Sequence, residues 1–247
     1  MLYDIYTVFW RDWVVLRRRL AKFLLSRMVA PLLYMIAFGL GLGKSVQVIA
    51  GMSYLDFLVP GIIALNSMNI SFNSVGPTLH TARVFHKSLE EYLVAPIGSW
   101  PFILGKVLAG ALRGLISSGI IMLLAYAFGA HFLVNGWFLF VLTLNCVIFA
   151  SLGFIAAMTI QSHEDMGSFN TYVLLPMSFL CGTFFRTDHL PELCARFIEL
   201  LPLTHASALL RSIGLQRGVS WTSLVVLLFY AAVFLALSRW VMERARR

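Results

Sequence analysis

The chain has 247 residues, of which 60% are hydrophobic and only 12% are charged, and its mean hydropathy is +0.84. A soluble domain carries roughly 25% charged residues, so this composition excludes a soluble globular protein and indicates an integral membrane protein. The formal net charge of +8 does not indicate nucleic-acid binding, because the basic residues cluster at the ends of apolar runs, where they set the topology of membrane proteins.

Residues 1–22 predict an amphipathic helix. Its apolar, aromatic-rich face comprises Tyr3, Tyr6, Phe9, Trp10, Trp13 and Leu16. Arginine and aspartate side chains supply the polar face. A helix of this kind can lie in the plane of the membrane interface, although an ordinary cytoplasmic helix is the alternative.

Six apolar runs, each about long enough to cross a bilayer as a helix, predict six membrane spans. They cover approximately residues 23–43, 57–78, 107–128, 137–160, 169–185 and 221–242. The third span is expected to start at residue 107 or later, because Arg113 lies within it. The predicted fold class is therefore an all-α integral membrane protein, with residues 1–247 forming a single transmembrane domain.

The distribution of basic residues predicts the topology. Six spans place both termini on the same side of the membrane. Lysine and arginine are concentrated at the two termini and in the loop between spans 2 and 3, and such an excess marks the cytoplasmic side. We therefore expect a multi-pass protein with both termini in the cytoplasm.

Residues 38–45, FGLGLGKS, look like the start of a nucleotide-binding loop. The motif G-x-x-x-x-G-K-[ST] requires glycine where Phe38 stands, and it follows a strand. This stretch instead follows an apolar run, at the outer end of span 1. We expect it to end a membrane helix, so any ATP hydrolysis belongs to another chain.

Span 2 carries a series of amide side chains. Asn66, Asn69 and Asn73 follow one another at i, i+3 and i+7. Polar residues inside a bilayer usually face protein or a cavity. We expect the set to line a substrate path or a dimer seam, although helix packing explains any single member equally well. Asn145 and Asn170 are expected to make packing hydrogen bonds.

The loop of residues 83–100, between spans 2 and 3, mixes charged and apolar residues. Lys87 and Glu91 are four residues apart and can pair on a helix, which Pro96 and Gly98 would end. A short amphipathic helix here could dock into a groove on a cytoplasmic partner. A solvated connector lying on the lipid headgroups fits the pattern equally well.

Two further polar features lie near span ends. His163, Glu164 and Asp165 could bind a metal or perform acid–base chemistry. They sit in a short loop without a second ligand cluster, so a polar turn that caps span 5 is favoured. Arg113 is expected to snorkel to the inner interface, with contact to a substrate phosphate as the alternative.

The segment 186–217 is too polar to span the membrane, yet it contains the apolar stretches FIELLPL and ALLRSI. Pro191 and Pro202 divide it, and His205 and Arg211 follow. Short re-entrant helices in the outer leaflet fit this pattern, because irregular backbone at membrane depth needs cover from protein.

Four stretches, taken in order, resemble the membrane subunit of a type-2 ABC exporter. They are YLDFLVPGIIA at 54–64, LEEYLVAPIGSWPFILGK at 89–106, LLPMSFLCGTFF at 174–185 and LLPLTHASALLRSI at 200–213. The resemblance covers nearly the whole chain and is closest to the permeases of nodulation-factor and polysaccharide exporters. Arg186 stands where that subgroup usually has proline.

The resemblance implies a transport subunit of a bacterial inner (plasma) membrane, and not an enzyme. Two identical copies would pair, and two separate ABC ATPase subunits would hold ATP and Mg²⁺, while this chain binds no cofactor. ATP binding would push on the 83–100 segment, and alternating access would move a lipid-like, glycolipid or other amphiphilic substrate outward. The coupling residues implied are Arg83, Lys87, Glu90, Glu91 and Pro96. The 186–217 region would form an outer lid.

Two other functional classes stay open. A membrane-embedded enzyme acting on lipid-linked substrates would use His163, Glu164 and Asp165, and substituting them would abolish its activity. A non-transporting scaffold would tolerate loss of the asparagine series. For a transporter, the sequence leaves a glycolipid, a polysaccharide on a lipid carrier, a drug-like amphiphile and a phospholipid as substrates.

Overall fold

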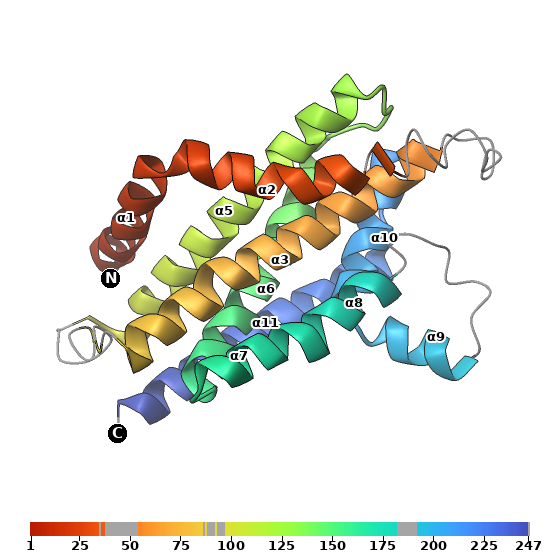
Figure 1. Ribbon diagram of the computed structural model, residues 1–247. Helices are drawn as coiled ribbons and strands as arrows, with labels where there is room; N and C mark the ends of the chain where they lie inside the picture. The colour runs from red at the N-terminus through yellow and green to blue at the C-terminus, as the bar shows by residue number, and fades with distance from the viewer. Residues whose placement is uncertain are drawn as a thin grey trace.

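Figure 1 shows a computed structural model of the chain, which describes residues 1–34, 36–37, 54–85, 87, 92, 97–181 and 192–246. Within these residues every regular element is a helix, so the predicted all-α class is confirmed. The elements are α1 (Leu2–Arg18), α2 (Leu20–Tyr34), α3 (Tyr54–Val84), α5 (Ser99–Ala127), α6 (Gly136–Thr159), α7 (His163–Phe169), the π-helical η2 (Asn170–Leu174), α8 (Leu175–Leu180), α9 (Glu192–Glu199), α10 (Pro202–Gly214) and α11 (Trp221–Ala245).

Four helices in the described part of the chain are long and apolar enough to cross a membrane, namely α3, α5, α6 and α11. They coincide with the spans predicted at 57–78, 107–128, 137–160 and 221–242. The expectation that Arg113 delays the third helix is wrong, because α5 begins at Ser99 and runs through Arg113. The helix accommodates this cation because α1 supplies a hydrogen-bond partner for it.

The spans predicted at 23–43 and 169–185 are described only in part. Helix α2 ends at Tyr34, and most of the remaining first span, including the stretch 38–45, lies outside the described residues. Helical conformation is continuous from His163 to Leu180 through α7, η2 and α8, a length of about 27 Å at 1.5 Å per residue. The count of six spans stays a prediction.

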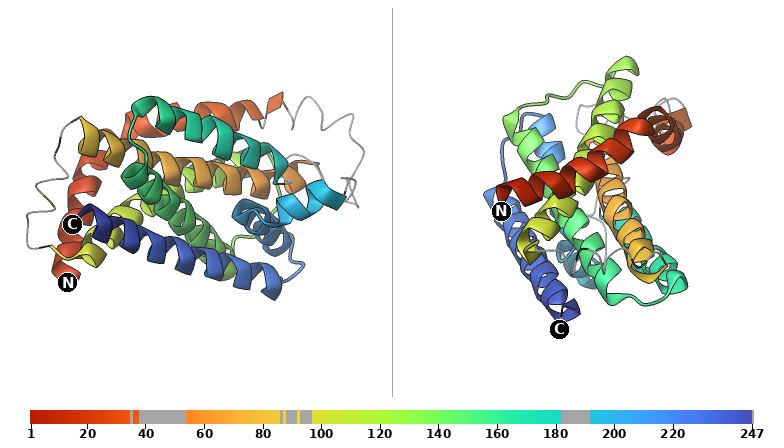
Figure 2. Two further views of the ribbon diagram at one scale, coloured as in Figure 1. Left: turned by 90° about the horizontal axis from the view of Figure 1, so that it is seen from below. Right: turned by 90° about the vertical axis from the view of Figure 1, so that its left-hand side faces the viewer.

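The long helices α3, α5 and α6 pack against one another, and α11 packs against α6 (Figure 1). Both chain termini lie at one end of this bundle, and α1 lies at the same end (Figures 1 and 2). Helices α9 and α10 lie toward the opposite end. There the loop after α5 is fastened to the start of α3, since the backbone N–H of His131 donates to Asp56 Oδ1 at 2.6 Å.

Glycines allow α3, α5 and α6 to approach closely. A Cβ atom added to Gly153 of α6 would lie 2.7 Å from the backbone oxygen of Phe72 on α3. A Cβ atom added to Gly114 of α5 would collide with the Ser71 hydroxyl of α3. Membrane helices commonly associate through small residues, because lipid provides no hydrophobic force between them.

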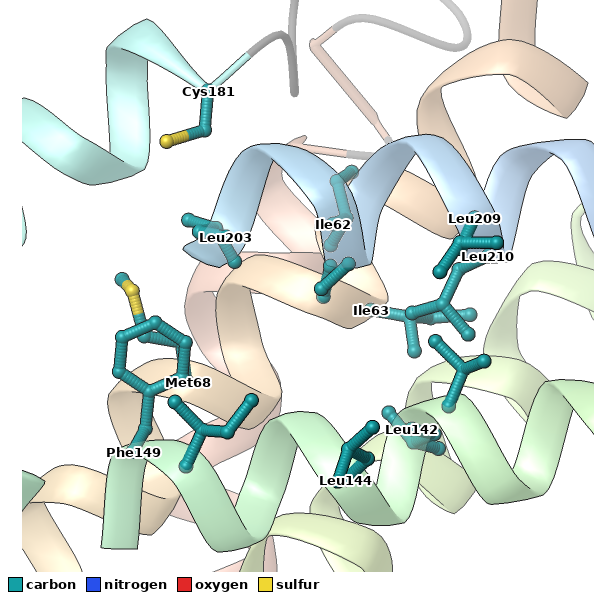
Figure 3. Packing of buried hydrophobic residues seen from close by; sticks show 14 of the residues in the cluster. Ile62, Ile63, Met68, Leu142, Leu144, Phe149, Cys181, Leu203, Leu209 and Leu210 are labelled. Carbon is teal, nitrogen blue, oxygen red and sulfur yellow. The ribbon is translucent and has the colours of Figure 1, made fainter. Parts of the chain in front are cut away.

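A buried apolar cluster joins α3, α6 and α10 in the half of the bundle that contains α10 (Figure 3). Its members include Ile62, Ile63 and Met68 of α3, Leu142, Leu144 and Phe149 of α6, and Leu203, Leu209 and Leu210 of α10. Helix α10 is thus held inside the bundle, although its 13 residues extend about 20 Å, less than the roughly 30 Å of a bilayer core.

The outward faces of the bundle are apolar. Helix α11 exposes Trp221, Val225 and Phe229, at intervals of four residues, and each is more than 60% exposed. Helix α2 exposes Leu25 and Val29 in the same way. Such continuous apolar surface is typical of contact with lipid.

Candidate functional site

One face of α3 is polar and open, whereas the rest of this helix is enclosed. Between residues 57 and 80, the residues of α3 that are not buried are Leu65, Asn69, Asn73, Ser74, Pro77 and Thr78. They recur at intervals of about four residues, so they form one stripe along the helix. We call this stripe the polar seam.

The three amides predicted as a set separate in the structure. Asn66 is only 7% exposed, and its Nδ2 donates to Ser117 Oγ on α5 at 2.9 Å. Asn69 and Asn73 lie on the polar seam and donate to carbonyls of α3 itself, at 3.1 Å and 2.8 Å. Asn66 therefore joins α3 to α5, and Asn69 and Asn73 belong to the open face.

Asn145 of α6 makes the packing contacts that the sequence predicted. It is fully buried, and its Nδ2 donates to Ser67 Oγ at 2.8 Å and to the Ala64 carbonyl at 3.2 Å, both on α3. Amide side chains buried between membrane helices stabilise their association in this way.

A cavity of about 230 Å³ adjoins the polar seam at Asn69. Its walls come from α2, α3, η2 and α8: Tyr34, Leu65, Asn69, Asn170, Thr171, Leu175, Ser178 and Phe179. Asn170, expected to make a packing bond, instead lines this space from a π-helical turn, a feature frequent at functional sites. Amides, hydroxyls and aromatic rings together suit a ligand that carries hydroxyl groups beside an apolar surface.

A second cavity, of about 240 Å³, adjoins the other end of the polar seam and is called the inner cavity here. Ser74 and Thr78 line it from α3, together with Arg11 and Asp12 of α1 and Lys106 of α5; Val15, Leu79, Ala82, Tyr92 and Arg113 complete the walls. The polar seam therefore runs from the cavity at Asn69 to this inner cavity.

Charged groups fasten α1 to α5 at the inner cavity. Lys106 Nζ lies 3.0 Å and 2.9 Å from the two carboxylate oxygens of Asp12, and Arg113 donates from Nη2 to the Asp12 carbonyl at 3.3 Å. Sequence reasoning missed this ion pair, because the partners are far apart in the chain. Beside it, Gly105 of α5 leaves room for the buried Val8 of α1.

Arg83 lies at the last turn of α3, at the same end of the bundle. Its Nη1 donates to the carbonyls of Ala157 at 3.1 Å and Ile160 at 3.4 Å, and to that of Met158. These carbonyls belong to the end of α6, where backbone acceptors lack partners within the helix and a cation is favourable. Arg83 thus ties the end of α3 to the end of α6.

The rest of the 83–100 segment is described in part. Lys87 has φ of 51°, a conformation uncommon for residues other than glycine. The Tyr92 ring lies 5.1 Å from the Arg11 guanidinium, so the segment contacts α1. Several predicted residues lie outside the described part of the chain, namely Glu90, Glu91 and Pro96 here and Pro191 in the outer region.

His163, Glu164 and Asp165 form the first turn of α7. The Ser162 hydroxyl accepts a hydrogen bond from the Asp165 backbone N–H at 3.0 Å, and acidic side chains at this position stabilise a helix N-terminus. The predicted polar turn is confirmed. In the described ranges, no group of three or more His, Cys, Asp or Glu side chains is placed to hold a metal ion.

The outer region forms two short helices, α9 and α10. Pro202 is the first residue of α10, a position where its missing N–H is harmless. The His205 ring contacts the Glu199 carbonyl at 2.8 Å, and Arg211 Nε donates to the Phe57 carbonyl of α3 at 3.1 Å. These residues hold α10 in place, and its re-entrant position in a membrane stays a prediction.

The chain is similar in sequence to a family of transporters and to known bacterial membrane proteins. The model of the ABC-2 type transporter family matches residues 3–215. The inner membrane transport permease YadH of Escherichia coli K12 is 28% identical over 242 residues, covering 96% of this chain and 91% of YadH. Nodulation protein J of Bradyrhizobium diazoefficiens is 27% identical over 243 residues, covering 93% and 92% of the two chains. The matches thus include α1, the polar seam and the outer helices.

Proposed function

The chain belongs to the ABC-2 type transporter family, and on that premise we propose that it is the permease subunit of an ATP-driven exporter. It moves an amphiphilic, hydroxyl-bearing substrate outward across a bacterial inner membrane, with both termini in the cytoplasm. Two copies form the transport path, and a separate ABC ATPase holds and hydrolyses ATP with Mg²⁺. The four apolar helices and their lipid-facing surfaces support the membrane-spanning part of this proposal.

The observation that carries the proposal is the polar seam of α3. A polar face at membrane depth costs free energy unless protein, water or a ligand covers it. The seam joins two cavities along an otherwise enclosed helix. A second copy laid against this face would close it into a path between the subunits. Asn69 and Asn73 line that path, whereas Asn66 serves the packing of α3 against α5.

The cavity at Asn69 favours a glycolipid-like substrate. Asn69, Asn170 and Ser178 offer donors and acceptors for sugar hydroxyls, and Tyr34 and Phe179 offer apolar rings. This chemistry agrees with the likeness to permeases of nodulation-factor and polysaccharide exporters. The substrate is released outward past α9 and α10.

Coupling to the ATPase is assigned to the 83–100 segment. Its described residues lie at the end of the bundle that holds both termini (Figure 2). Arg83 links α3 to α6 there, so a push on the segment moves these two helices together. Lys87, Glu90, Glu91 and Pro96 form the docking surface in this proposal.

An export assay tests the role of the polar seam. A strain without the chromosomal copy is complemented with the wild type or with Asn69→Leu/Asn73→Leu, and surface lipids and glycans are compared by mass spectrometry. The species restored by the wild type should fall about tenfold or more in the variant, the effect of losing about 1.4 kcal/mol of contacts.

The matched control is Thr143→Leu, which removes a polar side chain from an exposed position on α6. This variant should export normally. Wild-type export by the double variant, at equal protein levels, would rule out a path along the polar seam.

A further inference from the structure

A third cavity, of about 230 Å³, lies at the elbow where α1 meets α2 and is called the elbow cavity here. It is lined by Val15, Leu16, Arg19, Lys22, Phe23, Ser26 and Arg113. Three of these side chains are cationic, and they come from three places: the junction after α1, the start of α2 and the middle of α5. A cavity that gathers cations from separate elements points to an anionic ligand.

The positive charge of the elbow cavity is not balanced by its own walls. Among the described residues that line it, none is an aspartate or glutamate. The Asp12 carboxylate is held by Lys106 in the inner cavity, and Asp12 offers Arg113 its backbone carbonyl. Arg113 is half-buried in α5, which also contains Lys106. Both cations lie near the single carboxylate of Asp12, so positive charge is in excess there, and a cation at membrane depth is costly without a counter-charge.

The other walls of the elbow cavity are apolar. Val15 and Leu16 come from α1 and Phe23 comes from α2. Beyond Phe23, the exposed Leu25 and Val29 continue an apolar surface along α2. A ligand that fits both parts has an anionic head and a hydrocarbon tail.

The exposed aromatic residues of α1 lead us to expect the elbow near the lipid headgroups. Helix α1 exposes Tyr3, Tyr6 and Trp10, and tyrosine and tryptophan are enriched where a membrane meets water. Helix α2 then leads away from α1 with its apolar surface exposed (Figure 1). The phosphate of a bilayer lipid is therefore close to the cavity in the native membrane.

We propose that the elbow cavity binds the phosphate headgroup of an anionic phospholipid from the surrounding bilayer. Arg19, Lys22 and Arg113 contact the phosphate, for which guanidinium groups are well suited, and one acyl chain follows α2 from Phe23. The lipid adds a second counter-charge beside Asp12, which Arg113 shares with Lys106, and holds α1, α2 and α5 at a fixed angle. This inference concerns a bound membrane lipid and does not depend on what the permease transports.

Lipid titration followed by native mass spectrometry tests the proposal on the delipidated full-length chain. The probes are phosphatidylglycerol and phosphatidylcholine, which share acyl chains and differ in net charge. The wild type should retain phosphatidylglycerol in preference to phosphatidylcholine. Arg19→Gln/Lys22→Gln should weaken phosphatidylglycerol binding by about fivefold for each cation removed and leave phosphatidylcholine binding unchanged.

The matched control is Arg17→Gln/Arg18→Gln, which removes the same charge from exposed positions on the preceding turn. This control should bind phosphatidylglycerol like the wild type, and Arg113→Gln should lose binding like Arg19→Gln/Lys22→Gln. Equal loss in both double variants, or no lipid preference in the wild type, would overturn the site. Displacement of phosphatidylglycerol by millimolar inorganic phosphate would overturn the assignment to a bilayer lipid.

Discussion

Arg83 illustrates how one side chain in this bundle can join two helices. Its guanidinium reaches the carbonyls of Ala157, Met158 and Ile160 at the end of α6. The resemblance implies a coupling role for Arg83, and in the function proposed above these contacts would pass a displacement of the α3 terminus to α6.

Replacing Arg83 with glutamine should destabilise the protein by about 1–3 kcal/mol, because part-buried hydrogen bonds from a charged group to the α6 carbonyls are lost. Thermal unfolding in detergent measures the effect. Arg239→Gln is the control, since Arg239 pairs with Glu243 at 2.7 Å on an exposed helix face and such pairs contribute about 0.3–0.5 kcal/mol. Equal melting temperatures for the two variants would show that Arg83 does not join the helices.

The three asparagines of α3 show what the sequence alone does not reveal about individual side chains. Spacing predicted that Asn66, Asn69 and Asn73 act as one set, but Asn66 is buried against α5, whereas Asn69 and Asn73 lie on the polar seam. Whether each meets a neighbouring helix or an open space depends on where α5 lies, and α5 covers Asn66 but leaves Asn69 half-buried. The difference in burial between Asn66 and Asn69 arises from tertiary packing, and no pattern in the neighbouring sequence predicts it.

In the described part of the chain, α3 and α6 make the most extensive contact between two helices, and glycine makes it possible. Gly153 lies against the α3 backbone near Phe72, and Gly76 of α3 lies near Gly153 in turn. Close backbone approach lets Asn145 reach Ser67 and Ala64. Helices α3 and α6 therefore form a closely packed pair, and the polar seam lies on the open side of α3.

Gly153→Val should destabilise the bundle by about 1–3 kcal/mol, because the added atoms overlap the α3 backbone and force the helices apart. Gly119→Val is a matched control on α5, since a Cβ there meets no heavy atom within 4 Å. Both substitutions carry the same cost in helix propensity, so the difference between their unfolding midpoints isolates packing. A Gly153 variant as stable as the Gly119 variant would contradict the close α3–α6 contact.

Hydropathy predicted the four long helices well, since each is a continuous apolar run. It placed the start of α5 too late, because Lys106 and Arg113 look unfavourable in a span until α1 supplies Asp12 as their partner. The prolines, and not hydropathy, predicted the division of the outer region, and Pro202 does begin α10, where the missing N–H of proline favours a helix start. No pattern in the sequence around η2 predicted the cavity that this turn lines.

At the scale of the whole molecule, the bundle has two different ends. One holds both termini, α1, the C-terminal end of α3 and the described part of the 83–100 segment; the other holds α9, α10 and the loop after α5 (Figures 1 and 2). A permease driven from the cytoplasm needs this division, with ATPase docking at one end and substrate release at the other.

Cysteine accessibility tests the orientation. Tyr3→Cys and Arg244→Cys should react with a membrane-impermeant maleimide only after spheroplasts are permeabilised, whereas His131→Cys should react in intact ones. All three positions are exposed. The native Cys146 and Cys181 are buried, and the third native cysteine, Cys194, is replaced by serine in the parent chain. The parent chain provides the background, and the reverse labelling pattern would place the termini outside.

ATP-driven transport is tested most directly by purifying this chain from its native membrane in mild detergent and identifying the proteins that accompany it. We expect a soluble ABC ATPase in equal amount to the permease, lost from Glu90→Ala/Glu91→Ala while that variant remains in the membrane. Absence of any ATPase, under conditions that preserve other membrane complexes, would contradict a transport subunit driven by a partner chain.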